Sequence, residues 1–309
     1  MKTSALAKVI LAFGSVSLLG AQVDYFTDNG FGNPSSTLQH PTGEHFKGTT
    51  YIAYQGPHED AWVATYHHAS KTWSGPVLAG VSLMGKTPDP INDDDVDNHG
   101  KPAMMVDSKG YIHVVFGAHG GSPTLGENRL GTPGSLRGGK LTHMVSKNPE
   151  DISSWQVLDN ISPFGTYPQF VQMDSGDTYL FYRHGAHRSD WVYQKSSDDG
   201  RTFRAPVSVL KHKAQADPAL HDAWYAWFGK GHGDTITASY VYHPCANPGH
   251  TNDRLNTYYM TLQRQGRHLA QRRRRKAHRP GDQRVRRPQD PHRKHRRRAQ
   301  QPRHRPHGP

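Results

Sequence analysis

The chain has 309 residues, enough for one large domain or two ordinary ones. Its net charge of +12 is concentrated at one end: residues 264–309 hold 18 Lys and Arg against two Asp, and the rest hold 20 basic and 24 acidic residues. The body is therefore mildly acidic, so overall charge does not indicate a nucleic-acid-binding protein. A single cysteine excludes an internal disulfide framework, and no apolar run reaches the roughly 18 to 20 residues that span a membrane.

Residues 1–21 are typical of a secretory signal. Lys2 and Lys8 form a basic region, an apolar run covers residues 9–19, and Gly20 and Ala21 supply small residues near a cleavage site. We therefore expect a secreted protein whose mature chain begins near Gln22. A plain N-terminal helix is the alternative.

Residues 264–309 have a different composition from the body. Residues 272–276 and 296–298 are runs of Arg and Lys, and aliphatic residues are too rare to offset the entropy of ordering the chain. We expect a disordered Arg-rich tail and interpret the abrupt change as a shift of reading frame, with a polyanion-binding arm as the alternative. The expected organisation is a signal at 1–21, a folded domain at 22–263 and the tail at 264–309.

The folded domain alternates short strand-like runs with turns rich in Gly, Asp, Asn and Pro. The runs are rich in β-branched and aromatic residues, and no long helical period is present, so an all-β fold is predicted. The predicted strands cover residues 50–54, 61–66, 111–116, 178–182, 191–194 and 235–242.

A weak internal repeat indicates a β-propeller. Residues 196–203 (SSDDGRTF) fit the Asp-box turn S-x-D-x-G-x-T-F, in which Ser196 and Asp198 bond backbone N–H groups and Phe203 packs between sheets. Residues 70–77 and 146–155 are looser copies. The spacing predicts about four blade-sized units, and because propellers usually have more blades and close on themselves, we expect an incomplete propeller.

Four short stretches near predicted strand ends concentrate His, Tyr and Arg. They are residues 98–102, 117–121, 165–169 and 181–185. A single His between glycines is more often a turn residue than a catalyst. The joint pattern favours a site, because the strands of a propeller converge on one axial face.

These motifs resemble a known family. Residues 98–102 (NHGKP), 107–114 (DSKGYIHV) and 117–120 (GAHG) are similar to the BNR-type propeller family that includes the secreted ulvan lyases of polysaccharide lyase families 25 and 24. Residues 167–169 (YPQ), 182–183 (YR) and 191–193 (WVY), with the Asp box, continue the resemblance from about residue 22 to 263. It implies a seven-bladed propeller, of which about four blades are present here, and β-elimination in ulvan at a uronic acid linked to rhamnose 3-sulfate.

The resemblance also implies that His99, His119, Tyr167 and Arg183 are catalytic and that Tyr225 contacts substrate. Elimination needs a group that neutralises the uronate carboxylate, a base for the C5 proton and an acid for the departing O4. Arg183 can hold the carboxylate in a planar fork, a neutral His can act as base, and Tyr167 can act as acid or base. The sequence leaves the acid and base unassigned, and Tyr225 has the alternative role of a packing aromatic.

A second group of residues suits a structural Zn²⁺ site. His232, His243, Cys245 and His250 offer imidazole and thiolate ligands, and the resemblance implies a structural metal. The alternative is a buried free cysteine with surface histidines. Residues 93–95 (DDD) could hold Ca²⁺, although a solvated acidic loop is the simpler interpretation.

Two other functions remain open. A sialidase-like glycoside hydrolase shares the Asp box but needs a cluster of arginines, and a non-catalytic glycan-binding propeller needs no catalytic groups. The expected partner is the sulfated polysaccharide ulvan. We expect a monomer that binds neither nucleic acid nor membrane.

Overall fold

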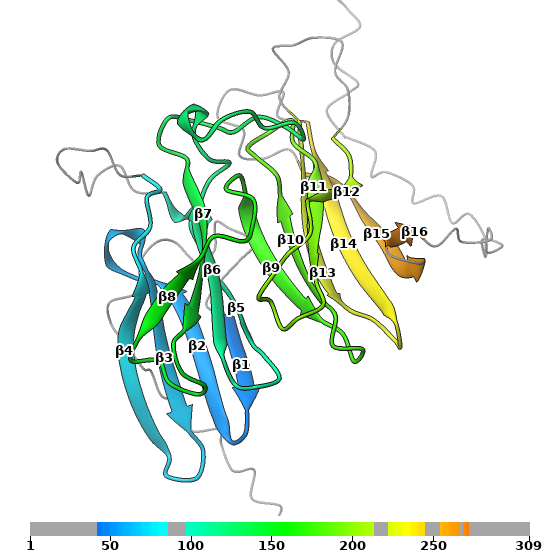
Figure 1. Cartoon of the computed structure of the whole chain (residues 1–309). Helices are drawn as coiled ribbons and strands as arrows, with labels where there is room; N and C mark the ends of the chain where they lie inside the picture. Colours follow the sequence, from blue (N-terminus) through cyan, green and yellow to red (C-terminus); the bar gives the residue numbers. More distant parts are fainter. Residues whose placement is uncertain (1–41, 86–96, 213–221, 245–253, 266–267, 272–309) are drawn as a thin grey trace, which may run out of the picture. The chain divides into compact units, whose positions relative to one another are not determined.

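The computed structural model describes residues 42–85, 97–212, 222–244, 254–265 and 268–271 (Figure 1). The predicted signal, the acidic run at 93–95, the two residues Cys245 and His250, and the chain from residue 272 lie outside the described residues. None of the described helices has the length and apolar character needed to cross a membrane.

The described strands form four antiparallel sheets of four strands each, and within each sheet the strands follow chain order. The first sheet contains β1 (Thr42–Phe46), β2 (Thr49–Gln55), β3 (Ala61–His67) and β4 (Thr72–Gly80). The second contains β5 (Ala103–Val106), β6 (Ile112–Ala118), β7 (Gly139–Ser146) and β8 (Trp155–Leu158). The third contains β9 (Thr166–Gln172), β10 (Thr178–Arg183), β11 (Trp191–Ser196) and β12 (Val207–Leu210). The fourth contains β13 (Ala223–Lys230), β14 (Thr235–His243), β15 (Leu255–Gln265) and β16 (His268–Gln271).

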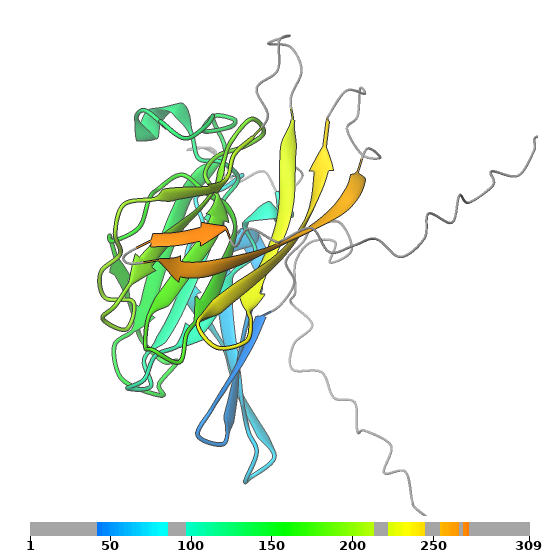
Figure 2. The same ribbon diagram turned by 90° about the vertical axis from the view of Figure 1, so that its right-hand side faces the viewer.

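Successive sheets meet through their first strands. β1 lies beside β5, β5 beside β9, and β9 beside β13, and Figures 1 and 2 show the sheets following one another from blue to orange. A four-stranded meander repeated in this way is the blade arrangement of a β-propeller. The predictions of an all-β propeller and of about four blades are therefore confirmed.

All six predicted strands are present, with ends shifted by one or two residues. Those missed include the inner strands β5, β9 and β13. Their burial explains this: β5 is buried along its whole length, so it lacks the alternation of polar and apolar residues that marks a half-exposed strand. In β9, Pro168 interrupts the pattern.

The last sheet continues past the boundary expected at residue 263. β15 runs to Gln265, and β16 pairs with it in antiparallel register from Leu262↔Gln271 to Gln265↔His268. Backbone hydrogen bonds form this edge, so it does not need the apolar side chains whose scarcity suggested the earlier boundary.

Each interface between neighbouring sheets holds its own apolar core. One cluster of buried residues joins the first and second sheets, a second joins the second and third, and the largest joins the third and fourth. Large rings dominate the third interface, where Phe181 stacks on Phe228 with centroids 4.1 Å apart. Such packing holds the strand ends of adjacent sheets in fixed positions.

The Asp box is formed as predicted, between β11 and β12. Asp198 Oδ1 accepts from the backbone N–H of Thr202 at 2.9 Å, and Ser196 Oγ accepts from that of Gly200 at 2.9 Å. The ring of Phe203 packs against the buried core between the second and third sheets, with its centroid 6.0 Å from that of His143. The turn therefore links two blades.

A buried pair of histidines lies in the same interface. His113 Nδ1 is 3.0 Å from His143 Nε2, and His143 Nδ1 is 2.8 Å from the Asn160 side-chain oxygen. Both rings are almost inaccessible to solvent. Burial lowers the pKa of both, that of His143 to about 3, because the interior disfavours the charged imidazolium.

This pair predicts sensitivity to acid. The folded protein keeps His143 neutral down to a pKa of about 3, whereas an unfolded chain protonates it near pH 6.5, so the unfolded state binds more protons between those values. The free energy of unfolding should fall as the pH is lowered through this window, by up to about 1.4 kcal/mol per pH unit for each such histidine. Thermal melts across this range should show a shallower loss of Tm for His143→Gln than for the wild type. The exposed His68→Gln serves as control, and equal slopes for all three proteins would contradict the assignment.

Candidate active site

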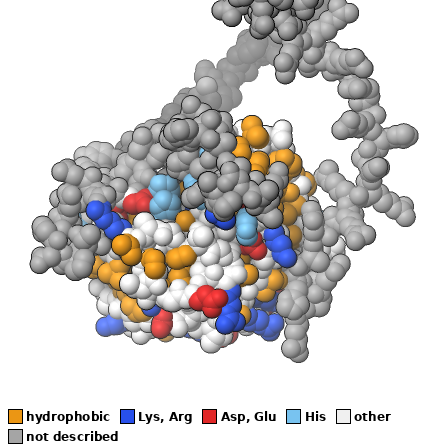
Figure 3. All heavy atoms as spheres, turned by 90° about the horizontal axis from the view of Figure 1, so that it is seen from above, with side chains coloured by type: hydrophobic (Ala, Val, Ile, Leu, Met, Phe, Trp, Pro, Cys, Tyr) orange, Lys and Arg blue, Asp and Glu red, His pale blue; other side chains and the backbone are white. Residues whose placement is uncertain are grey.

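The five site residues predicted from the sequence lie at the same end of the sheets. His99 belongs to the short helix η3 (Asn98–Gly100) that precedes β5, and His119 directly follows β6. Tyr167 is the second residue of β9, Arg183 ends β10, and Tyr225 lies near the start of β13. Figure 3 views this face from above and shows histidine side chains at its surface. Because neighbouring antiparallel strands start and end at the same edge, the meander itself brings these segments together.

Two of the histidines form a stacked pair that one carboxylate joins. The rings of His99 and His119 lie 3.9 Å apart with only 6° between their planes. One oxygen of Asp97 contacts His99 Nδ1, and the other lies 2.5 Å from His119 Nδ1. Asp97 also accepts from the backbone N–H of His99 at 3.0 Å. The sequence analysis missed Asp97, whose only sequence signal is its place two residues before His99.

The electrostatics of this cluster follow from its burial and hydrogen bonds. Burial alone raises the pKa of Asp97, but hydrogen bonds from His119 and His99 outweigh it and hold that pKa far below its usual range. Burial lowers the pKa of His119, and its hydrogen bond to Asp97 opposes this only in part. A charged Asp97 beside a neutral His119 is therefore the stable state near neutral pH.

Tyr167 is buried in an unusual backbone conformation. Its φ is +60°, in the left-handed region that a bulky residue rarely adopts. The pairing of β9 with β10 shifts register between Phe181 and Arg183, so that Tyr167 and Pro168 face one residue of the neighbouring strand. Such a bulge re-aims a side chain. The Tyr167 ring lies 5.8 Å from that of His99 and 5.7 Å from that of Tyr225.

Burial raises the pKa of the Tyr167 phenol well above its usual range, although the charge of Arg183 opposes the shift. The phenol is therefore protonated at neutral pH, as a general acid must be before it acts.

Arg183 is completely buried and lacks a carboxylate partner among the described residues. Its guanidinium carbon lies 5.1 Å from the ring centroid of Tyr167 and 5.4 Å from that of Tyr225. Nε donates to the Gly185 carbonyl at 3.4 Å, and buried Nη1 has no hydrogen-bond partner. A buried polar atom without a partner is costly, so this donor is well suited to a bound anion.

Tyr225 lies between two arginines. Besides Arg183, Arg254 places its guanidinium carbon 4.3 Å from the Tyr225 ring centroid. The packing and substrate-contact roles considered for Tyr225 are compatible, because its buried ring supports both cations at the edge of the site.

The structure separates two of the predicted zinc ligands, His243 and His232, and the other two lie outside the described residues. His243 is buried at the end of β14, and its Nδ1 accepts from Arg254 at 2.7 Å. His232 lies in the turn before β14, at the opposite end of this nine-residue strand, so a site built on His243 does not include His232. His187, which the sequence analysis did not select, has its ring 5.5 Å from that of His243. Asp97, His99 and His119 are the one group of three potential ligands found in the described ranges, within 4.8 Å of one another.

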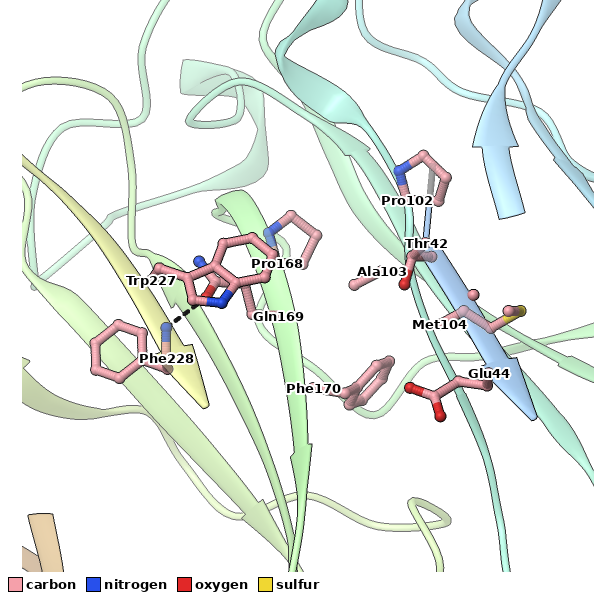
Figure 4. A pocket seen from close by; sticks show the side chains of 11 residues that line it. Thr42, Glu44, Pro102, Ala103, Met104, Pro168, Gln169, Phe170, Trp227 and Phe228 are labelled. Atoms are coloured by element: carbon pink, nitrogen blue, oxygen red, sulfur yellow. Dashed lines mark hydrogen bonds between the residues drawn. The ribbon is translucent and has the colours of Figure 1, made fainter. Parts of the chain in front are cut away.

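A cavity of about 420 Å³ lies between the inner strands β1, β5, β9 and β13 (Figure 4). Gln169 joins two of these strands, since its Oε1 accepts from the Phe228 N–H at 2.8 Å and its Nε2 donates to the Ala226 carbonyl at 2.9 Å. Glu44 is the only titratable side chain in the lining, and burial raises its pKa. The cavity therefore lacks the histidines and the cation that the strand-end site combines.

Repeated four-stranded blades with an Asp box, and a His–Tyr–Arg site where the strands end, define a β-propeller of the BNR type. The chain belongs to the BNR repeat-containing family, which matches residues 49–280.

The relatives include two proteins named ulvan lyase. One from Nonlabens ulvanivorans is 53% identical over 248 residues, which cover 78% of this chain and 52% of the relative. Another, from Alteromonas sp. (strain LOR), is 53% identical over 247 residues, which cover 78% of this chain and 50% of the relative. The chain therefore spans about half the length of these relatives.

A solved polysaccharide lyase of family 25, an ulvan lyase bound to -[GlcA(1-4)Rha3S]-, has a TM-score of 0.71 and 51% identity. The match covers 78% of this chain and 55% of that one. The resemblance to ulvan lyases inferred from the sequence is confirmed.

Proposed function

We propose that the protein is a polysaccharide lyase that cleaves ulvan by β-elimination at a uronic acid linked to rhamnose 3-sulfate. The observation that carries the proposal is a site that brings together two histidines, a protonated tyrosine and a buried arginine with an unsatisfied Nη1. The chain that holds this site is 53% identical to an ulvan lyase over 248 residues. The fragment bound to the solved relative contains this linkage.

Arg183 would bind the uronate carboxylate. Its unpaired Nη1 offers a donor, and its charge stabilises the negative charge that develops as C5 loses its proton. Because the buried arginine packs against two aromatic rings, little reorganisation is needed when substrate binds.

The stacked histidines would supply the base and Tyr167 the acid. With Nδ1 of each ring directed at Asp97, an Nε2 lone pair can accept the C5 proton. The C–H electron pair becomes the C4–C5 double bond, the C4–O4 bond breaks, and O4 leaves with the phenolic proton of Tyr167. Proton transfer from the resulting imidazolium to the tyrosinate restores both groups.

One assay separates this reaction from the two alternatives. The 309-residue chain should generate the ultraviolet absorbance of an unsaturated uronate from ulvan. New reducing ends without that absorbance would indicate a hydrolase, and saturable binding without either product would indicate a glycan-binding module. A sialidase needs a cluster of arginines. Arg254 shares the Tyr225 ring with Arg183, but Arg201 lies over Tyr111 and Arg129 pairs with Glu127, which favours the lyase.

We also propose a structural zinc site built on His243, with Cys245 and His250. Buried His243 has the ring of His187 5.5 Å away, so these two imidazoles would join Cys245 and His250 as ligands. Zinc binding would require Arg254 to leave His243 Nδ1, because a neutral imidazole that accepts at Nδ1 carries its proton on Nε2. When bound, zinc would hold these segments together rather than take part in the chemistry.

The zinc proposal predicts about one zinc per purified chain and a clear loss of Tm in Cys245→Ser, because structural zinc contributes folding free energy. Removing zinc with a chelator should lower the Tm of the wild type to that of the variant. His232→Ala, at the far end of β14, is the control and should keep its zinc. Well-folded protein free of zinc would end the proposal.

Export and assembly complete the proposed function. A secreted monomer that binds neither nucleic acid nor membrane fits a lyase acting on an extracellular polysaccharide. N-terminal sequencing of secreted protein should begin near Gln22, and an intact Met1 in the medium would contradict cleavage.

A further inference from the structure

The two stacked histidines depend on a single acidic side chain. Asp97 presents one oxygen to Nδ1 of His99 and the other to Nδ1 of His119, and it makes no ion pair with an arginine or lysine among the described residues. An ionised carboxylate can only accept hydrogen bonds, so each ring must carry its proton on the nitrogen that faces Asp97.

We propose that Asp97 is a positioning residue that fixes both histidines as Nδ1–H tautomers and leaves both Nε2 atoms free toward the site. The inference rests on the proposed lyase function for its catalytic meaning, although the tautomers themselves can be measured without activity.

The stacking of the two rings limits the positive charge that the pair can carry. Two imidazolium rings 3.9 Å apart would repel each other, so the pair can take up one proton more readily than two. Asp97 balances that one charge: the three side chains carry a net charge of −1 when both rings are neutral and zero once either Nε2 has accepted a proton. The negative charge of Asp97 thus stabilises the imidazolium that forms during elimination.

The first sheet holds Asp97 in place. The backbone N–H of Asp97 donates to Glu59 Oε1, and its carbonyl accepts from Gln55 Nε2 at 3.2 Å. Glu59 is itself buried, at the end of the short helix η1 (Pro57–Glu59), with φ at +62°. The neighbouring blade therefore anchors the backbone from which the carboxylate reaches the two rings.

A metal ion is the competing explanation for a carboxylate beside two histidines. Ligand atoms bound at about 2.0 to 2.2 Å around one ion lie roughly 3 Å or more from one another. Here both carboxylate oxygens lie at hydrogen-bond distance or closer from Nδ1, which leaves no room for an ion between them. The geometry favours direct hydrogen bonds.

The decisive measurement is nitrogen NMR of the 309-residue chain labelled with ¹⁵N-histidine, because the shifts of the two ring nitrogens reveal which one is protonated. His99→Gln and His119→Gln assign the signals. Both rings should be Nδ1–H tautomers in their neutral form. An Nε2–H tautomer in either ring would overturn the proposal even if the protein proved not to be a lyase. A shift of both signals on stoichiometric zinc addition would also overturn it.

Asp97→Asn should switch one ring to the other tautomer. An amide offers a single acceptor oxygen, and its NH₂ must face a bare nitrogen, so one histidine has to move its proton to Nε2. If both rings remain Nδ1–H in this variant, Asp97 does not set the tautomer. If the variant does not fold, the wild-type spectrum alone decides.

Asp107→Asn is a matched control. Asp107 is a buried carboxylate whose Oδ2 lies 3.5 Å from His113 Nε2, next to the other buried histidine pair. This variant should leave the signals of His99 and His119 unchanged.

Where turnover is measurable, Asp97→Asn should lower kcat at least tenfold, and up to the about 10⁴-fold known for a histidine in the wrong tautomer, with little change in KM. A rise in KM alone would argue against positioning.

Discussion

His119→Ala and Tyr167→Phe are each expected to lower kcat on ulvan by roughly a hundredfold or more, the usual loss when a positioned proton-transfer group is removed. The His119 variant loses one Nε2 of the stacked pair, and the Tyr167 variant keeps the ring that packs against Trp191 and Tyr225 but loses the proton for O4. His99→Ala should fall between these variants and the wild type if its ring mainly orients and balances His119. Initial rates of unsaturated product, at saturating ulvan, measure the effect.

The matched control is His113→Ala. His113 is buried in the interface between two sheets, where it bonds to His143, and it lies at the opposite end of β6 from His119. Its removal should cost roughly 2 kcal/mol or more of stability, through a cavity and a lost hydrogen bond, while kcat stays near that of the wild type. Near-wild-type turnover in both the His119 and Tyr167 variants would end the site assignment.

His113 and His119 show what a strand pattern in the sequence can predict. His113 and His119 lie six residues apart, and the strand predicted over residues 111–116 stops between them, before Gly117. β6 in fact runs through Gly117 to Ala118, but its pairing with β7 shifts register between Phe116 and Ala118, and Gly117 has a φ of +88°. The strand is longer than predicted, yet the local break that separates a core histidine from a site histidine is present.

The fold was predictable because its signals are local. Half-buried strands carry alternating patterns, and the Asp box places its own hydrogen bonds within eight residues. The inner strands escaped prediction because burial on both faces removes alternation.

The site could be predicted only in part for a related reason. His99, His119, Tyr167 and Arg183 follow from motifs at strand ends, whereas the role of Asp97 depends on a partner 22 residues away in sequence. Its backbone anchors, Gln55 and Glu59, lie in another blade. Grouping His232 with His243 as ligands of one zinc was wrong for the opposite reason. The two residues are close in sequence, but the whole length of β14 separates them in space.

Arg183→Ala is expected to lower kcat by about 10² to 10³-fold, the range for removing a donor that stabilises developing negative charge, and also to weaken ulvan binding. Both effects follow from one contact, because the uronate carboxylate is bound in the ground state and gains charge density as C5 loses its proton. Loss of binding can be followed by calorimetric titration with ulvan oligosaccharides, which does not require turnover.

Arg183→Lys separates charge from geometry. The ammonium keeps the positive charge but cannot present two parallel donors. It is also more strongly hydrated than a guanidinium, so burial against Tyr167 and Tyr225 suits it less well. We therefore expect lysine to restore only part of the binding and less of kcat. Arg201→Ala is the control, because the two arginines lie at opposite ends of β11. Arg183 pairs with Trp191 at the start of that strand, and Arg201 belongs to the Asp-box turn that follows its end. Full rescue by lysine would mean that a point charge is enough to bind the carboxylate. An effect of Arg201→Ala as large as that of Arg183→Ala would mean that the overall positive charge, rather than the guanidinium fork of Arg183, governs recognition of this polyanion.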